Sequence, residues 1–176
     1  MAIYTLDMTV IRDANKSDAN ALSEFAKLCF IDTFAHLYSK ENLLKHLQKT
    51  CSPAYFSEAL LHDKILLAED NALIGYIKFG EISLPIDSIP CGSKEIHRLY
   101  VHPEFKGQGI GRDLMRQAFD HSVLKASKHV YLSVYEDNTH AQKFYQNHGF
   151  SIIGEYDYYV GSHIDREFIM HKKNPD

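Results

Sequence analysis

The sequence contains no tryptophan, only three cysteines and no hydrophobic run near the ~20 residues that a membrane-spanning helix needs. Cys29, Cys51 and Cys91 form neither a CxxC pair nor a disulfide framework, which is typical of proteins in a reducing compartment. Residues 1–12 contain no basic segment followed by an apolar one, so we expect no signal peptide there. These absences predict a cytoplasmic protein without a membrane partner.

An excess of positive charge is also missing. The 19 Lys and Arg residues are outnumbered by 23 Asp and Glu residues, and the formal net charge is -4. Proteins that wrap nucleic acid or bind anionic membranes need a basic surface, so we expect neither partner. The 11 histidines form no HExxH motif and no His/Cys pair at zinc-finger spacing, so we expect no metal site.

The chain does have enough hydrophobic side chains for one core. Its 176 residues, 45% of them hydrophobic, suit one domain that spans residues 1–176. The hydrophobic periodicity predicts the element order β-α-α-α-β-β-β-α-β-α-β-β, an α/β (α+β) domain. The expected strands cover residues 9–12, 64–69, 73–81, 95–101, 129–134, 150–160 and 164–171, and the expected helices begin near residues 17, 39, 53, 109 and 138.

The first and fourth of these helices carry expectations that a structure can check. Ser17 offers a side-chain oxygen as the cap of the first helix. The spacing of apolar residues predicts one buried face on that helix, formed by Leu22, Phe25, Leu28 and Cys29. The fourth helix is expected to run without a break from residue 109 or 110 to about residue 127.

A glycine-rich turn, Gly107-Gln108-Gly109-Ile110-Gly111, links a strand to this fourth helix. Glycine lets successive backbone N–H groups point inward, and the helix N-terminus adds the positive end of its dipole. Such a turn can bind a diphosphate; the alternative is a flexible turn with incidental glycines. No GxxxxGK[ST] string occurs, and the GxGxG spacing followed by an antiparallel hairpin argues against a Rossmann site.

Two segments together resemble the GNAT superfamily of N-acetyltransferases. Residues 95–111 resemble its acetyl-CoA signature, with Lys106 where the family usually has Arg or Gln. Residues 138–150 resemble a second landmark, N-x-x-A-x-x-[FL]-Y-x-x-x-G-F, in the right order along the chain. The resemblance covers residues 64–171 most clearly. It implies a GNAT fold: a mixed, mostly antiparallel central sheet flanked by helices, with a splayed pair of parallel strands that holds acetyl-CoA.

The resemblance also implies how acetyl-CoA is bound. The pantetheine arm would pair with the backbone of Leu99 and Val101, and Asn138 would bond its amide groups, although Asn138 is equally placed as a helix cap. A backbone N–H near Leu99 or Tyr100 would stabilise the oxyanion. The diphosphate would sit on backbone amides, with help from the next helix residue; the residues concerned are Lys106, Gly107, Gln108, Gly109, Ile110, Gly111 and Arg112.

The reaction implied is direct attack of a primary amine on the thioester in a ternary complex. Tyr145 would donate a proton to the leaving thiolate; the alternative is an aromatic that only packs beside Phe144. Glu95 would take the proton of the amine, directly or through water, and His97 is a comparable candidate. By the period of two, Glu95 and His97 share a strand face with Leu99 and Val101. A solvated charge at a strand start is the alternative for Glu95.

The acceptor is less sharply indicated. Phe30, Thr33, Phe34, the Glu41-Asn42-Leu43 run and the IHRLYV strand resemble PaiA-type polyamine acetyltransferases, which implies spermidine or spermine as the small-molecule amine. An acidic cleft for such a polycation is expected from Asp32, Glu41, Glu58, Glu81 and Asp87.

Two other functions stay open. A protein lysine or N-terminal acetyltransferase would show a wide, shallow groove instead of a closed acidic pocket, and a CoA-binding regulatory module would lack turnover. The three tyrosines of residues 156–160 fit either the edge of a homodimer or the acceptor wall.

Overall fold

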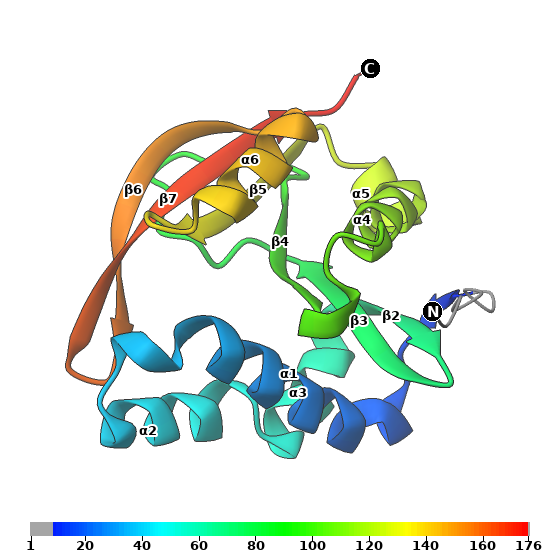
Figure 1. Ribbon diagram of the computed structural model, residues 1–176. Helices are drawn as coiled ribbons and strands as arrows, with labels where there is room; N and C mark the ends of the chain where they lie inside the picture. The colour runs from blue at the N-terminus through cyan, green and yellow to red at the C-terminus, as the bar shows by residue number, and fades with distance from the viewer. Residues whose placement is uncertain (1–8, 176) are drawn as a thin grey trace.

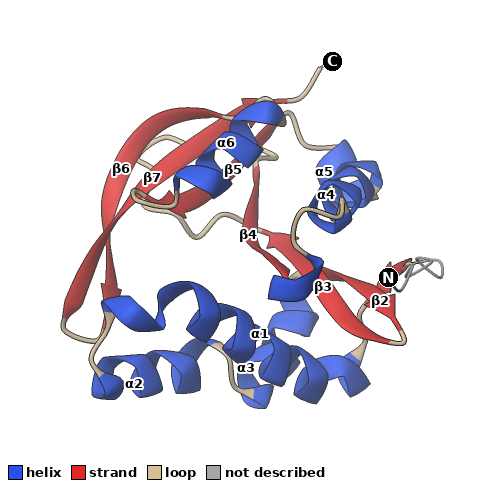
Figure 2. Cartoon of the chain, in the orientation of Figure 1, coloured by secondary structure: helices blue, strands red, loops and turns tan. Residues whose placement is uncertain are grey.

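The computed structural model describes residues 9–175, and residues 1–8 and 176 lie outside the described part. Most of the segment in which we expect no signal peptide therefore lies outside it. One seven-stranded sheet runs through the protein in the order β1-β2-β3-β4-β5-β7-β6 (Figures 1 and 2). Its strands are β1 (Val10–Asp13), β2 (Lys64–Asp70), β3 (Ala72–Gly80), β4 (Lys94–Val101), β5 (His129–Tyr135), β6 (Ser151–Val160) and β7 (His163–Lys173).

The helices cover the sheet in separate groups, as Figure 1 shows. They are α1 (Ala19–Phe34), α2 (Lys40–Thr50), α3 (Pro53–His62), α4 (Ile110–Asp120), α5 (Ser122–Lys125) and α6 (Thr139–Asn147). Helices α1 to α3 pack against β2 and β3 through a cluster that includes Leu22, Phe56 and Tyr76. Helices α4 and α5 cover a second cluster around Ile77 and Leu114. The expected mixed, mostly antiparallel sheet flanked by helices is confirmed.

The central pair of strands is the one parallel pair in the sheet of residues 9–175. It is short, because β4 pairs with β5 only at Lys94 with Val130 and at Glu95 with Tyr131. Beyond Glu95 the two strands separate, while β4 stays paired with β3 as far as Val101. The sheet therefore opens between β4 and β5, as a splayed pair requires.

The start of the first helix differs from the expectation. Ser17 is not the cap of α1, which begins without a side-chain cap; Asn15 instead caps the 3-10 turn before α1, because its Oδ1 accepts a hydrogen bond from the Ser17 N–H at 3.0 Å. A reciprocal bond from the Asn15 N–H to Asp18 completes a capping box around a short 3-10 turn, Lys16–Asp18. Leu28 was expected on the buried face and is 43% exposed. The buried face of α1 includes Leu22, Phe25, Ala26 and Cys29.

The fourth helix is broken, which the apolar spacing does not reveal. Helix α4 ends at Asp120, and His121 adopts an extended backbone with φ -66° and ψ 138°. The His121 side chain then caps α5, because its Nδ1 accepts a hydrogen bond from the Val123 N–H at 3.2 Å. Apolar residues on both sides of the break face the same core, so the helical period in the sequence continues across it.

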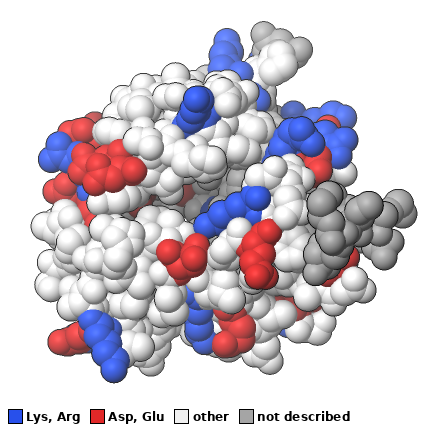
Figure 3. All heavy atoms as spheres, viewed as in Figure 1, with Lys and Arg blue, Asp and Glu red and all other residues white. Residues whose placement is uncertain are grey.

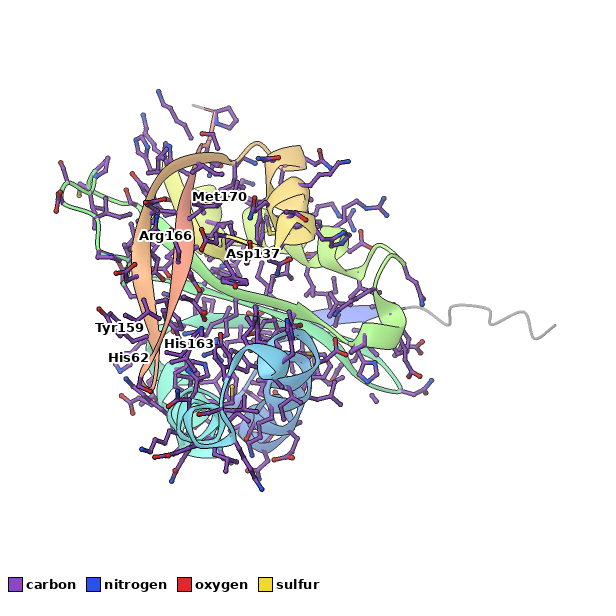
Figure 4. The ribbon with its side chains drawn as sticks, turned by 60° about the vertical axis from the view of Figure 1, so that its left-hand side comes forward. His62, Asp137, Tyr159, His163, Arg166 and Met170 are labelled. Atoms are coloured by element: carbon purple, nitrogen blue, oxygen red, sulfur yellow. The ribbon has the colours of Figure 1, made fainter. Side chains whose placement is uncertain are left out.

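The last hairpin reaches back to helix α2 near the other end of the chain. Asn42 Nδ2 lies 3.2 Å from Ser162 Oγ, and Asn42 Oδ1 accepts the Ser162 N–H at 3.3 Å. Gly161 turns the hairpin at φ 62°, and a Cβ added there would lie 2.2 Å from Asn42 Oδ1. We call this contact of Asn42, Gly161 and Ser162 the hairpin latch. Figure 4 shows Tyr159 and His163 where the hairpin meets the N-terminal helices.

We predict that Gly161→Ala destabilises the fold by about 1–2 kcal/mol, because alanine disfavours the left-handed backbone and its methyl group would displace Asn42. Urea denaturation followed by circular dichroism measures the change. Gly154→Ala, where the new Cβ would meet nothing within 4 Å and φ is not positive, is the matched control. Equal stability of the two variants would contradict the latch.

Candidate active site

A cleft of about 1230 Å³ opens where β4 and β5 separate. Its walls come from α1, the loop after β3, β4, the glycine-rich turn, β5, α6 and the β6–β7 hairpin. Figure 3 shows a hollow near the middle of this face, with acidic and basic side chains at its rim. Phe30, Thr33 and Phe34 of α1, which carry part of the resemblance to PaiA-type enzymes, also line the cleft.

The open edge of β4 offers backbone groups to this cleft. The His102 N–H donates to the Ile74 carbonyl of the β3 side at 2.9 Å. Because the hydrogen-bonding side alternates along a strand, Tyr100 also bonds toward β3, and Leu99 and Val101 present their backbone groups to the open side. An extended ligand arm can pair there as an additional strand would.

The glycine-rich turn lies at the end of the same edge. Gly107 and Gly109 have φ of 78° and 90°, a left-handed backbone that favours glycine. Helix α4 starts after Gly109 without a side-chain cap. The N–H groups of the turn and first helical residues, Gly107, Gly109, Ile110, Gly111 and Arg112, have no acceptor among the described residues. They form a site for an anion such as a diphosphate.

Most of the predicted cofactor-binding residues line this cleft, and two do not. Those that line it are Leu99, Tyr100, Val101, Lys106, Gly107, Gly109, Gly111, Arg112, Asn138 and Tyr145. The Gln108 side chain instead bonds the Glu104 carbonyl at 2.9 Å, and the Ile110 side chain is buried under α4. These two residues can contribute only backbone groups.

Asn138 and Tyr145 come from helix α6 and its start. Asn138 caps the helix, since its Oδ1 accepts a hydrogen bond from the Ala141 N–H at 3.1 Å. The cap uses only the side-chain oxygen of Asn138, so the side-chain nitrogen can still bond a ligand in the cleft. Tyr145 packs edge-on to Phe144 and Phe150, with ring centroids 5.4 and 6.1 Å apart. Burial, and then the charge of Glu167, raises the pKa of Tyr145, so the phenol stays protonated at neutral pH.

Glu95 is buried, so the alternative interpretation, a solvated charge at the start of a strand, is excluded. Its Oε2 accepts hydrogen bonds from the Ser83 N–H at 2.6 Å and the Leu84 N–H at 3.2 Å. Its Oε1 lies 3.1 Å from His97 Nδ1. Burial opposes ionisation, but these partners, His97 first, outweigh it and lower the pKa of Glu95 below its usual value. The carboxylate is therefore ionised and held in place.

The prediction that Glu95 and His97 share a strand face with Leu99 and Val101 is wrong for both residues. The β3–β4 register pairs Lys78 with Arg98 and Phe79 with Ile96, so His97 is the extra residue of a β-bulge. Because of the bulge, Ile96 joins Leu99 and Val101 in the cluster under α4. The sequence contains no signal for this, since a bulge depends on the partner strand.

The bulge places His97 between two carboxylates. Its Nδ1 faces Glu95, and its Nε2 lies 3.5 Å from Asp63 Oδ1, an ion-pair distance without a well-directed hydrogen bond. Burial lowers the pKa of His97, but Asp63 and Glu95 outweigh it and raise the pKa above its usual 6.5. Asp63 also accepts a hydrogen bond from Lys78 Nζ at 2.8 Å, and its pKa falls to about 2, because His97 and Lys78 outweigh the effect of burial.

The acidic lining comes mostly from residues that the sequence did not single out. Of the five expected acids only Glu81 lines the cleft. Asp32 pairs with Lys106 at 3.0 Å and Glu41 with Lys45 at 2.7 Å, both on the surface. The lining acids are instead Asp63, Glu81, Glu95, Asp165 and Glu167. Carboxylates two residues apart in a hydrophobic strand, as at Asp165 and Glu167, are the one signal that could have indicated them.

Four basic side chains share the cleft with these acids: Lys106 and Arg112 lie at the glycine-rich turn and the start of α4, and Lys78 and Arg98 lie on the strands. Lys78 is neutralised by Asp63. Arg98 donates to the Thr50 carbonyl at 2.8 Å and lies 5.0 Å from the centre of the Tyr55 ring, so it ties the end of α2 to the sheet. Apart from the two basic residues of the glycine-rich turn and α4, five carboxylates face Lys78 and Arg98, so the part of the cleft away from the turn favours a cationic ligand.

A family model described as the Acetyltransferase (GNAT) family matches residues 21–150. The chain belongs to the GNAT acetyltransferase family. It is an N-acetyltransferase by this membership, and the expectation drawn from the two motifs is confirmed. The match spans α1, the glycine-rich turn and α6, the elements that surround the cleft.

Several relatives refine the comparison. A spermine/spermidine N(1)-acetyltransferase of Bacillus subtilis is 26% identical over 69% of this chain and 82% of its own. An uncharacterised N-acetyltransferase of Archaeoglobus fulgidus is 30% identical over 77% of this chain and 88% of its own. The crystal structure of a PaiA N-acetyltransferase of Thermoplasma acidophilum, in complex with coenzyme A, is 25% identical, with TM-score 0.76 over 95% of this chain and 99% of its own.

Two kinds of feature are absent from residues 9–175. No helix there is long and apolar enough to cross a membrane. The same residues contain no group of three or more His, Cys, Asp or Glu side chains that could hold a metal ion.

We predict that the imidazole of His97 titrates above 6.5 and that Asp63→Asn lowers this pKa, because one of its two anionic partners is lost. Since the folded-state pKa is raised, the ion pairs of His97 stabilise the fold fully below pH 6.5 and less as pH rises through the folded pKa. Histidine NMR titration measures the shift. Glu58→Gln, which removes a carboxylate from the exposed pair with His62 (3.1 Å), is the control. An unchanged His97 pKa in Asp63→Asn would show that the two groups are not coupled.

Proposed function

We propose that the protein transfers the acetyl group of acetyl-CoA to a primary amine of a polyamine such as spermidine or spermine, by direct attack in a ternary complex. One observation carries the choice of acceptor. The hairpin latch bounds one end of the cleft by joining the β6–β7 hairpin to α2, and the carboxylates of Asp165 and Glu167 line the cleft there. The likeness to a spermine/spermidine acetyltransferase and to a PaiA structure supports the same choice.

The residues of the open edge suit acetyl-CoA. Leu99 and Val101 can pair with its pantetheine arm, and the uncapped start of α4 can hold its diphosphate, with Arg112 exposed nearby. Bound acetyl-CoA supplies an activated acetyl thioester. The Leu99 N–H, on the open side of β4, is placed to stabilise the oxyanion that forms when an amine attacks.

Proton transfer falls to His97 and Tyr145. A polyamine nitrogen is an ammonium at neutral pH and must lose a proton before it attacks. Glu95 is a weak base because its charge is already stabilised by three groups, whereas the pKa of His97 is raised above its usual 6.5, so the imidazole holds a transferred proton more firmly than Glu95 does. We assign proton acceptance to His97, with Glu95 and Asp63 positioning it. Tyr145, protonated in its buried setting, donates a proton to the departing sulfur.

The other functions fit the cleft less well. A lysine side chain or an N-terminus would bring one ammonium group to a cleft lined by five carboxylates, whereas a polyamine brings several. A regulatory module without turnover would not need a buried His97 between two carboxylates, an arrangement that costs desolvation free energy.

We predict that free thiol is released from acetyl-CoA in the presence of spermidine or spermine, with saturation, and not with a lysine peptide or without acceptor. A thiol-reactive chromophore records the rate. Protection of the fold against heat by acetyl-CoA, without release for any polyamine, would keep the cofactor site and reject the acceptor.

We predict that Tyr145→Phe lowers kcat by about 100-fold, the scale of a lost general acid, and leaves the affinity for acetyl-CoA nearly unchanged. Calorimetry measures the affinity and thiol release measures kcat. Tyr159→Phe, which removes the same hydroxyl from a tyrosine that is 63% exposed on β6, should behave as the unmodified protein. Full activity of Tyr145→Phe would remove its acid role.

A further inference from the structure

Asp165 of β7 is a buried carboxylate that the reaction above does not use. It is only 4% exposed and lines the closed end of the cleft. The Tyr38 hydroxyl donates to its Oδ2. Its Oδ1 has no hydrogen-bond donor among the described residues; His163 Nε2 lies 3.1 Å away without hydrogen-bond geometry. One oxygen of this buried acid therefore faces only His163 and lacks the hydrogen-bond donor that a bound ammonium group would supply.

Glu167 lies two residues further along the same strand and lines the same cleft. Tyr156 donates to its Oε2 at 3.0 Å. Burial, and then the negative charges of Asp165 and Glu95, raises the pKa of Glu167. The charge of Glu167 also raises the pKa of Tyr145. The strand register gives the order of the acids along the cleft: Glu95 pairs with Tyr131 and Tyr131 with His171, so Glu167 and then Asp165 lie further along β7 toward the hairpin.

Neither of the two β7 carboxylates forms an ion pair with a Lys or Arg side chain in residues 9–175. Arg166, between them in sequence, pairs with Glu155 at 3.0 Å instead (Figure 4 shows its position on the hairpin). Arg98 lines the cleft too, but it is held by the Thr50 carbonyl and Tyr55. Buried carboxylates without a cation are unfavourable, and a bound ammonium would stabilise them.

The spacing of the two acids matches that of polyamine nitrogens. Residues two apart on one face of a strand are roughly 6–7 Å apart. Nitrogens separated by three or four methylene groups are about 5–6 Å apart when extended, by standard bond lengths. Side-chain rotation covers the small difference, so two successive ammonium groups can each meet one carboxylate.

We propose that Asp165, with Tyr38, binds the distal ammonium group of the acceptor and Glu167 binds the next one, while the amine to be acetylated lies at His97. This inference rests on the proposed function and deepens it: Asp165 is the specificity-determining residue that selects an acceptor with a second positive charge. The hairpin latch supports the subsite, because it holds β7 against α2 and closes the cleft beyond Asp165.

The test compares spermidine with butylamine, which has one amine and cannot reach Asp165 with a charge. For the unmodified protein we expect kcat/KM to be at least tenfold higher for spermidine. Asp165→Asn should remove this preference, mainly by raising KM for spermidine. Asp157→Asn, the same substitution at an exposed position of neighbouring β6, is the matched control and should keep the preference.

The outcomes separate the two proposals. If spermidine is acetylated and Asp165→Asn keeps the KM of the unmodified protein, the subsite is wrong and the proposed function stands. If the unmodified protein acetylates neither amine, the proposed function fails and the subsite with it. If Asp165→Asn does not fold, the unmodified protein still decides: equal kcat/KM for butylamine, putrescine and spermidine would overturn the subsite.

Discussion

The separation of β4 from β5 is the constraint on which the rest of the structure depends. Parallel strands normally bury a continuous ladder, and here the ladder stops at Glu95. The backbone of Leu99 and Val101 is left without a strand partner on this side, although the Val101 carbonyl accepts a weak bond from Cys29 Sγ at 3.8 Å, and a ligand can pair with the open edge. Helices α4 and α6 begin at the two sides of this opening, so their N-termini and the open edge face one cleft.

The β-bulge at His97 gives this opening its chemistry. Without the extra residue, His97 would lie with Leu99 under α4, among aliphatic side chains. With it, the imidazole lies between Glu95 and Asp63, and a network of opposite charges is buried beside the ligand slot. The network is balanced, because Lys78 offsets Asp63 and the amides after β3 bind Glu95. A proton can therefore be held near neutral pH in a setting that would otherwise exclude charge.

Local patterns in the sequence predict local features well. The glycine-rich turn, the Asn138 cap and the tight turn at Asn71, with φ 57°, all follow from residues within a few positions of one another. The break at His121 does not, because both helical pieces face one core. The lining acids do not either: Asp63 ends α3, and Asp165 lies on the last strand, so their meeting in one cleft depends on strand register and on contacts between distant segments. The face of His97 depends on a bulge that only the partner strand defines.

The hairpin latch affects the order in which parts of the molecule can fold. Asn42 and Ser162 are separated by 120 residues, so the closed end of the cleft is made from the early and the late parts of the chain. During synthesis the N-terminal helices leave the ribosome long before β7 does. Their surface facing the future cleft stays uncovered until the final hairpin arrives. Contacts of such high contact order form slowly, so the glycine-rich turn can be in place well before the closed end.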